Sequence, residues 1–316
     1  MNNDIRFYDF DFNLLYILPQ SADKSGYTAV NATIEFSDFG NIEITFYSNE
    51  LKSIVRNNRD KILVIWRDFQ GYITSYMFTE TTNKLFGKHL NGLLQRAVIP
   101  TVSALTGEKE AGYILNNSIL SEISWLNAET GISGKGEKII YSTDKYMKAD
   151  KAVKEINELS KSGYMIKANI KSKTFTYCFL PRADNSLMLS VSNLNIYEPE
   201  LTYKNTDMAF GGWYEKKSDD TSTWTYITND STKTGIYKID TILSAETEEE
   251  AQKELNKCIS DYEIAAKTKT LEHGTDYNIG DIVRVQIDGV TEKRLVCGIN
   301  MWNEQSYGEE PILTEV

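Results

Sequence analysis

The stretch Asp276–Val285 reads Asp-Tyr-Asn-Ile-Gly-Asp-Ile-Val-Arg-Val, and it decides the fold class of this chain. From there the apolar residues Val283, Val285 and Ile287 alternate with Ile282, Arg284 and Gln286, which is typical of a half-buried strand. Asp288-Gly289 follows as a favoured two-residue turn, since glycine tolerates the positive φ that such turns require. Leu295, Cys297 and Ile299 then alternate along a returning strand. The C-terminal region therefore predicts a β-hairpin.

The first hundred residues show the same alternation. Val30, Ala32, Ile34 and Phe36 alternate before a turn at Asp38–Asn41, and Ile42, Ile44 and Phe46 alternate after it. The apolar run Ile62–Trp66 predicts a strand buried on both faces, and Asp68–Gly71 predicts the turn that leads to a strand over Tyr72–Thr79. The segment Leu85–Leu94 changes period, because Leu90, Leu93 and Leu94 have helical spacing, and Pro100 closes it.

The middle of the chain mixes helices and strands. Glycines interrupt residues 101–140, which predicts loops with one short helix near Ile119–Leu126. A helix is predicted from Thr143, with the apolar stripe Ala152, Val153, Ile156 and Leu159 and with Gly163 placed to stop it. Ile166–Lys171 and Thr174–Leu180 predict a hairpin.

The last third again reads as strands with one helix. Residues 191–245 predict strands around a polar loop at Lys216–Asp220. A helix opens at Thr247 with Glu250 as its capping box, and its predicted buried face is Ala251, Leu255, Cys258, Ile259 and Tyr262. The expected fold is α+β and predominantly β: two barrel-like domains, 1–100 and 191–316, flank a mixed insert with helix and hairpin at 101–190.

Composition limits the possible functions. With 316 residues, 41% hydrophobic and 25% charged, the chain is globular, and five prolines with 19 tyrosines favour β structure. The net charge of −11 and the lack of a basic block argue against specific nucleic-acid binding. The acidity serves either solubility or an acidic channel wall that DNA passes without sticking.

Cysteine usage and hydropathy predict a chain folded in a reducing cytoplasm. Cys178, Cys258 and Cys297 are too sparse for a disulfide framework or a zinc site, and we expect them to be small buried apolar residues. We expect no signal peptide, and no apolar run is long enough to span a membrane.

The search for chemistry finds no catalytic, cofactor-binding or metal-binding residue. His89 and His273 are the only histidines, lie in no catalytic motif and predict structural roles. Gly131–Gly136 lacks the first glycine and the Ser or Thr of a P-loop, so it predicts a flexible loop. The acidic pairs Asp9/Asp11, expected on one strand face, and Asp219/Asp220, expected in a loop, could serve a glycosidase, but nothing marks them as desolvated.

The aromatic cluster Trp213, Tyr214, Trp224 and Tyr226 leaves two interpretations open. Trp224 and Tyr226 would share one side of a strand, where such rings stack on sugars of a cell-wall glycan. The other interpretation is that these rings fill a barrel core or a subunit contact, where aromatic residues dominate the buried area.

Four stretches together resemble the baseplate hub, or tail-associated, proteins of long-tailed phages and phage-tail-like particles. Ala32–Ile44 is similar to the paired strands that open the family's first barrel, and Gly71–Ile73 to its next strand. Gly87–Arg96 is similar to the helix that follows, and Gly274–Val283 to the family's last barrel. The strands around Tyr203–Trp213 match more loosely.

The resemblance implies tube-type barrels and a homotrimer whose paired barrels form a pseudo-sixfold ring. Such a ring adapts a hexameric tail tube to a threefold tip, so the implied partners are a tail tube or distal tail protein and a spike or tip protein. The implied location is the baseplate of a virion or bacteriocin-like particle, assembled in the bacterial cytoplasm. Because the sequence ends soon after the second hairpin strand, we expect any lytic or spike function on a separate partner.

Two other classes stay open beside this structural role. The aromatic cluster favours a β-rich glycan-binding module, and the scattered carboxylates alone favour a cell-wall hydrolase. No enzyme activity and no cofactor are expected for the leading interpretation.

Overall fold

The computed structural model describes residues 3–21, 26–103, 107–203, 209–218, 221–235, 238–258, 262–269, 271–304 and 306–316. The chain divides into two compact units, which are described separately. Unit 1 comprises Met1–Leu189, Thr268–Arg284 and Glu292–Val316. Unit 2 comprises Ser190–Lys267 and Val285–Thr291.

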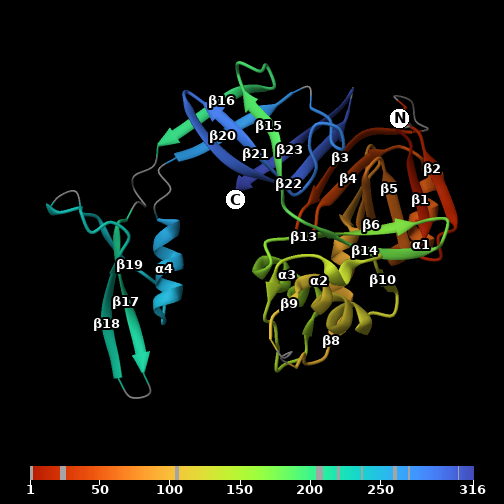
Figure 1. Cartoon of the computed structure of the whole chain (residues 1–316). Helices are drawn as coiled ribbons and strands as arrows, with labels where there is room; N and C mark the ends of the chain where they lie inside the picture. Colours follow the sequence, from red (N-terminus) through yellow and green to blue (C-terminus); the bar gives the residue numbers. More distant parts are fainter. Residues whose placement is uncertain are drawn as a thin grey trace. The chain divides into compact units, whose positions relative to one another are not determined.

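Unit 1 is dominated by a large sheet whose strand order differs from the order of the strands in the chain (Figure 1). Its strand order is β15-β21-β22-β3-β4-β7-β6-β5-β1-β2, with β23 also paired to β22. The strands are β1 Ile5–Asp9, β2 Leu14–Leu18, β3 Tyr27–Glu35, β4 Asn41–Phe46, β5 Ile62–Trp66, β6 Phe69–Phe78, β7 Asn83–His89, β15 Ala183–Ser190, β21 Asp281–Ile287, β22 Val290–Asn303 and β23 Tyr307–Glu315. Helix α1 (Asn49–Asn58) and the short 3-10 helix η1 (Arg59–Lys61) join β4 to β5.

The structure confirms the C-terminal hairpin. Val283, Val285 and Ile287 on β21 are buried, and Asp288 and Gly289 both have the positive φ of a two-residue hairpin turn. On β22 a register shift between Val296 and Gly298 interrupts the alternation, so Cys297 is only half-buried.

The partner of this hairpin was not foreseen. β22 pairs antiparallel with β3, from Gly298 opposite Glu35 to Asn303 opposite Val30, so N-terminal and C-terminal strands share one sheet. Predominantly β structure with helices is confirmed. Within the described residues, the strand path does not close into a barrel. The three domain ranges predicted from the sequence stay a prediction, for limited proteolysis to check.

The N-terminal hairpin β3–β4 is confirmed, with alternate residues from Val30 to Phe46 buried. The predicted turn at Asp68–Gly71 is wrong: Trp66 pairs with Phe69, so the turn is Arg67-Asp68, and Arg67 adopts φ 50°. The helix predicted over Leu85–Leu94 is partly wrong. Its first half is strand β7, whose alternate residues are buried, and the 3-10 helix η2 (Leu90–Arg96) supplies the leucines.

The insert packs short helices against a three-stranded sheet. Its strands and helices are β8 Val98–Ile99, β9 Lys109–Glu110, α2 Ala111–Ile114, the π-helix η3 Leu115–Ile119, η4 Leu120–Glu122, β10 Leu126–Ala128, η5 Ile132–Gly134, β11 Lys138–Ile139, β12 Met147–Lys148, α3 Ala149–Leu159, β13 Gly163–Asn169 and β14 Thr174–Leu180. The order β10-β14-β13 includes the predicted hairpin β13–β14. The short helix predicted near Ile119–Leu126 is misplaced, since the helical turns run over residues 111–122.

Helix α3 begins later than Thr143, because Met147 and Lys148 pair with Ile99 and Val98. Its stripe Ala152, Val153 and Ile156 is buried as predicted, but Leu159 is exposed. Gly163 does not stop the helix. It opens β13, where a Cβ would lie 2.3 Å from the Phe36 carbonyl oxygen.

Unit 2 holds a three-stranded sheet backed by a helix, and a two-stranded sheet. β17 (Gly211–Ser218) pairs with β18 (Thr221–Thr228) and with β19 (Asp240–Ile242), and β16 (Ile196–Tyr203) pairs with β20 (Tyr262–Thr268). Helix α4 (Glu248–Lys257) has the predicted capping box, in which Thr247 and Glu250 each accept from the other's backbone N–H. Ala251 and Leu255 are buried as predicted and Cys258 is half-buried, while Ile259 and the side chain of Tyr262 lie outside the described residues.

None of the helices that the structure describes is long and apolar enough to cross a membrane. The three cysteines are free thiols, and all are half-buried where the sequence predicted buried residues.

Candidate interaction surfaces

His89 lies in the core of unit 1 with 1% of its surface exposed. Its Nδ1 accepts a hydrogen bond from the Asn91 backbone N–H, at 3.3 Å. The edge of the Phe69 ring packs against the imidazole, with 5.6 Å between centroids. Burial lowers the pKa of His89 to about 4, so the ring is neutral at pH 7. With a buried, neutral ring, the geometry is that of a packing histidine.

His273 lies in the loop before β21, beside the turn between β5 and β6. Its Nδ1 is 3.2 Å from Asp68 Oδ2, and its backbone N–H donates to Glu309 Oε1 at 2.6 Å. The hydrogen bond from His273 is the largest influence on Asp68 and holds the pKa of that carboxyl below its usual range. These contacts tie loop, turn and strand β23 together within unit 1.

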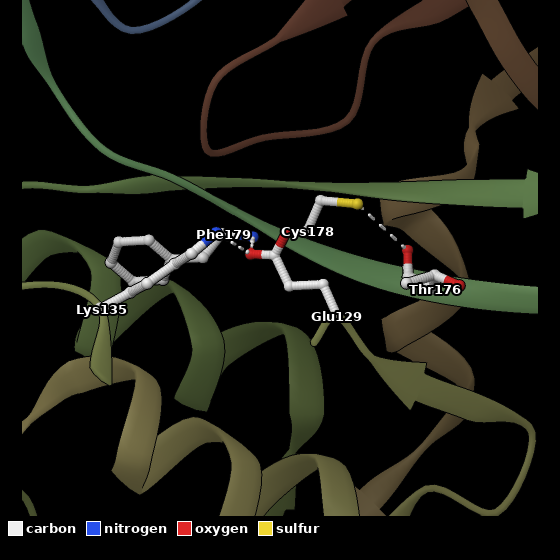
Figure 2. A network of polar contacts seen from close by, with 5 residues as sticks. All are labelled: Glu129, Lys135, Thr176, Cys178 and Phe179. Carbon is white, nitrogen blue, oxygen red and sulfur yellow. Dashed lines mark hydrogen bonds and ion pairs between the residues drawn. The ribbon is translucent and has the colours of Figure 1, made fainter. Parts of the chain in front are cut away.

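The glycine-containing segment Gly131–Gly136 forms the 3-10 helix η5 and does not cradle a ligand. Figure 2 shows its lysine engaged by the protein itself: Lys135 Nζ donates to Glu129 Oε1 at 3.0 Å, and the Phe179 backbone N–H donates to the same oxygen at 2.7 Å. On the same strand the Cys178 thiol points to the Thr176 carbonyl, and burial raises its pKa. Lys135 and Cys178 are thus each engaged by neighbouring groups of the insert.

The acidic pairs do not form a catalytic arrangement in the described residues. β1 ends at Asp9, so Asp9 and Asp11 do not share a strand face as predicted. Both oxygens of Asp9 instead accept from Asn13, through its backbone N–H and its Nδ2. Asp219 and Asp220 lie outside the described residues. The described part of the chain also brings together no group of three His, Cys, Asp or Glu residues that could hold a metal ion.

The aromatic cluster of unit 2 is divided between two faces of one sheet. Tyr214 is fully buried against α4 and Leu243. Trp213 and Trp224 are exposed on the other face, and Trp213 pairs with Tyr226 across the strands. A core position is therefore wrong for both tryptophans, while a subunit contact and a sugar-stacking platform stay predictions.

A hollow of about 410 Å³ lies on the large sheet of unit 1. Residues of β3, β4, β6, β7 and β22 line it, among them the polar Asn31, Thr33, Asn41 and Lys88 and the aromatic Phe86. These five residues occupy the positions between the buried residues of their strands, so one face of the sheet is apolar and the other mixes polar side chains with an aromatic ring.

Two buried amides that the sequence reasoning missed hold distant segments together. Asn91 and Asn303 are both fully buried. Asn91 bonds the strand β13 and the β3–β4 turn, and Asn303 bonds Tyr27 on β3 and Gln20. The only sequence signal was their polar character beside apolar neighbours.

The solved structures to which this fold is similar include tail proteins of prophages. A 43 kDa tail protein of prophage MuSo2 from Shewanella oneidensis matches with TM-score 0.58 at 12% identity, over 99% of this chain and 98% of that one. The prophage tail protein gp18 from Listeria monocytogenes matches with TM-score 0.58 at 13% identity, over 99% and 94%. A tail protein from Neisseria meningitidis matches with TM-score 0.56 at 12% identity, over 100% and 97%.

No protein-family model and no curated protein matches the sequence. At these identities the likeness concerns the fold alone. The chain has a phage tail protein fold, and the resemblance to tail-associated proteins that the sequence showed is confirmed at that level.

Proposed function

We propose that this chain is a structural baseplate hub protein of a phage tail or phage-tail-like particle, which forms a trimeric ring between the tail tube and the central spike or tip. The observation that carries the proposal is the mutual coverage: the fold spans nearly the whole of this chain and of three tail proteins, two of them from prophages. Chains from a Francisella PdpA–VgrG complex also match, with TM-scores of 0.50–0.53. These similarities support a tail-associated structural role, with a tube or distal tail protein and a spike or tip protein as partners.

The edge strand β2 supports assembly with further copies. Among the described strands it pairs only with β1. Its residues Leu14 and Ile17 are exposed. An open, apolar sheet edge carries unpaired backbone groups that invite pairing, and closure into a ring covers such an edge.

The face of the large sheet that carries the hollow supports a structural role without catalysis. Besides Phe86, this face carries amides, hydroxyls and paired charges such as Lys84 and Glu43, whose Nζ and Oε1 are 2.5 Å apart. A hub needs neither a nucleophile nor a metal. With a net charge of −11, the ring would repel a passing nucleic acid within about 8 Å at physiological salt.

Mass measurement in solution tests the proposal. We expect light scattering after size exclusion to give about 108 kDa for the chain alone, three times the 36.0 kDa of one chain. With the neighbouring tube or spike protein present, we expect three copies of this chain plus the mass of the bound partner. Ile17→Lys places a charge on the edge strand and should shift the mass towards the monomer. Ile140→Lys, at another exposed isoleucine, is the matched control and should not. A monomer under all conditions would contradict the proposal.

A further inference from the structure

The outer face of the β17–β18–β19 sheet in unit 2 carries exposed rings in adjacent register positions. Trp213 pairs with Tyr226 on one side and with Ile242 on the other, so these three side chains form one row across the sheet. Trp224 stands in the next row, opposite Glu215. The exposed fractions are 43% for Trp213, 56% for Trp224 and 74% for Ile242. The row therefore points away from the core of this unit.

The inner face of the same sheet already has its partner. Tyr214 is fully buried there with Leu243, and Ala251 and Leu255 of α4 complete the cluster. Folding of the unit thus depends on the inner face. The tryptophans of the outer face contribute no buried core, so their replacement should leave the fold intact.

Tyr226 is fixed in position on the outer face. Its hydroxyl donates to Asp240 Oδ1 at 3.0 Å, and Lys238 Nζ lies 3.0 Å from Asp240 Oδ2 and 4.4 Å from the centre of the Tyr226 ring. Gly211 permits this arrangement, because a Cβ there would lie 2.0 Å from the Tyr226 hydroxyl oxygen. The Tyr226 side chain therefore crosses β17 over Gly211. The Lys238 ammonium, a donor, and the Asp240 carboxylate, an acceptor, lie beside the row of Tyr226, Trp213 and Ile242.

We propose that this face binds an uncharged, N-acetylated polysaccharide, with its sugar rings stacked on Trp213 and Trp224. Indole faces pack on the C–H faces of pyranose rings, while Lys238, Asp240 and their neighbours can hydrogen-bond the sugar hydroxyls. Diagonal neighbours on adjacent strands are about 7–8 Å apart, so one oligosaccharide can meet both tryptophans. Ile242 beside Trp213 offers an apolar contact to the methyl of an acetamido group.

The size and charge of the face favour a glycan over a protein. Eight residues of β17 extend about 26 Å, and three strands span about 10–15 Å, which gives a few hundred Å². A stable protein interface needs about 800 Å² from each partner. The Lys238–Asp240 pair cancels its own charge, and Glu215 opposite Trp224 disfavours an anionic ligand, so the face suits an uncharged chain. This inference is independent of the hub function.

The test uses the full-length protein and chitohexaose, the hexamer of N-acetylglucosamine, with tryptophan fluorescence and calorimetry as readouts. We expect saturable binding that weakens at least about tenfold in Trp224→Ala and in Trp213→Ala, since each removes one stacking platform. Tyr146→Ala, which removes an exposed tyrosine in unit 1, is the control and should bind like the parent protein. Cellohexaose, which lacks acetamido groups, should bind more weakly.

Any other result of the binding measurements overturns the proposal or a named part of it. No binding of chitohexaose by the parent protein, or equal binding by the tryptophan variants, overturns the proposal. A Trp224→Ala variant that loses trimer mass while the parent protein ignores the sugar would make this face a protein interface instead. Equal affinity for cellohexaose overturns the role of Ile242. Because mass and sugar binding are measured separately, failure of this proposal is distinguishable from failure of the hub function.

Discussion

Replacement of Asn91 by alanine should reveal how the insert is joined to the large sheet. The Asn91 side chain donates through Nδ2 to the carbonyl oxygens of Asp38 and Tyr164, at 3.1 and 3.3 Å. Its Oδ1 accepts from the Ile166 backbone N–H at 2.8 Å. One buried amide therefore satisfies backbone groups of the β3–β4 turn and of strand β13. Its own backbone bond to His89 survives the replacement.

The loss in free energy of unfolding follows from the backbone groups that Asn91→Ala leaves without a hydrogen-bond partner. A buried polar group that loses its partner costs about 1–3 kcal/mol. The Ile166 N–H has a single proton to donate and should suffer the full cost, whereas the two carbonyls lose less because each keeps a second lone pair. We therefore expect Asn91→Ala to lower the free energy of unfolding by about 3 kcal/mol.

Urea unfolding followed by circular dichroism measures this difference at a fixed protein concentration. The matched control is Asn127→Ala, at an exposed asparagine on β10, for which we expect a change within about 0.5 kcal/mol. Hydrogen exchange should in addition show faster exchange of the Ile166 amide in the variant. A loss below about 1 kcal/mol for Asn91→Ala, with Ile166 still protected, would refute the argument that this amide joins the two parts.

Two further predictions concern buried polar groups. Asn303→Ala removes the bonds to the Tyr27 hydroxyl and from Gln20 Nε2, at 3.1 and 2.9 Å, and should cost about 2 kcal/mol in the same urea assay; a neutral effect would show that this contact is dispensable. His89 keeps its pKa near 4 in the folded state, against about 6.5 when unfolded, so its contribution is fully present above pH 6.5 and is lost as the pH falls towards 4. This loss should approach about 3 kcal/mol, and His89→Gln should remove that part of the pH dependence; an unchanged slope between pH 6.5 and 4 would contradict it.

Local patterns predicted the hairpins well and the sheet poorly. The alternation along β3, β4 and β21 and the Asp288-Gly289 turn are local signals, and so is the capping box at Thr247, so each could be recognised within a few residues. The pairing of β22 with β3 joins residues more than 260 positions apart, and period-two alternation identifies a strand without naming its neighbour.

Tertiary context explains the misplaced boundaries. The helix predicted from Thr143 begins at Ala149, because Met147 and Lys148 are drawn into a pair with β8. The turn before β6 falls on Arg67, which sequence propensity does not favour at positive φ. Its guanidinium lies 3.3 Å from the centre of the Tyr307 ring, a contact with β23 that a local pattern cannot contain.

For the aromatic surface of unit 2, too, one part could be predicted from local sequence and another could not. The sequence pointed to the aromatic residues of β17 and β18, because Trp-x-Tyr alternation is visible in one strand. It could not say which rings α4 would cover. Successive residues of a strand face opposite sides of the sheet, so Tyr214 faces the helix and Trp213 faces outward.

Two buried amides of unit 1, Asn91 and Asn303, lie where segments distant in sequence meet, and this placement has a physical consequence. Asn91 serves backbone groups of β13, and Asn303 joins β22 to Tyr27 on β3. Apolar contacts tolerate a shift of one strand past another better than such bonds do, since a slipped amide would leave its partners unpaired in the core. In the proposed ring every copy would present the same edge strands, so a fixed register would matter more there than in a monomer. These amides thus specify the pairing that the apolar alternation alone leaves open.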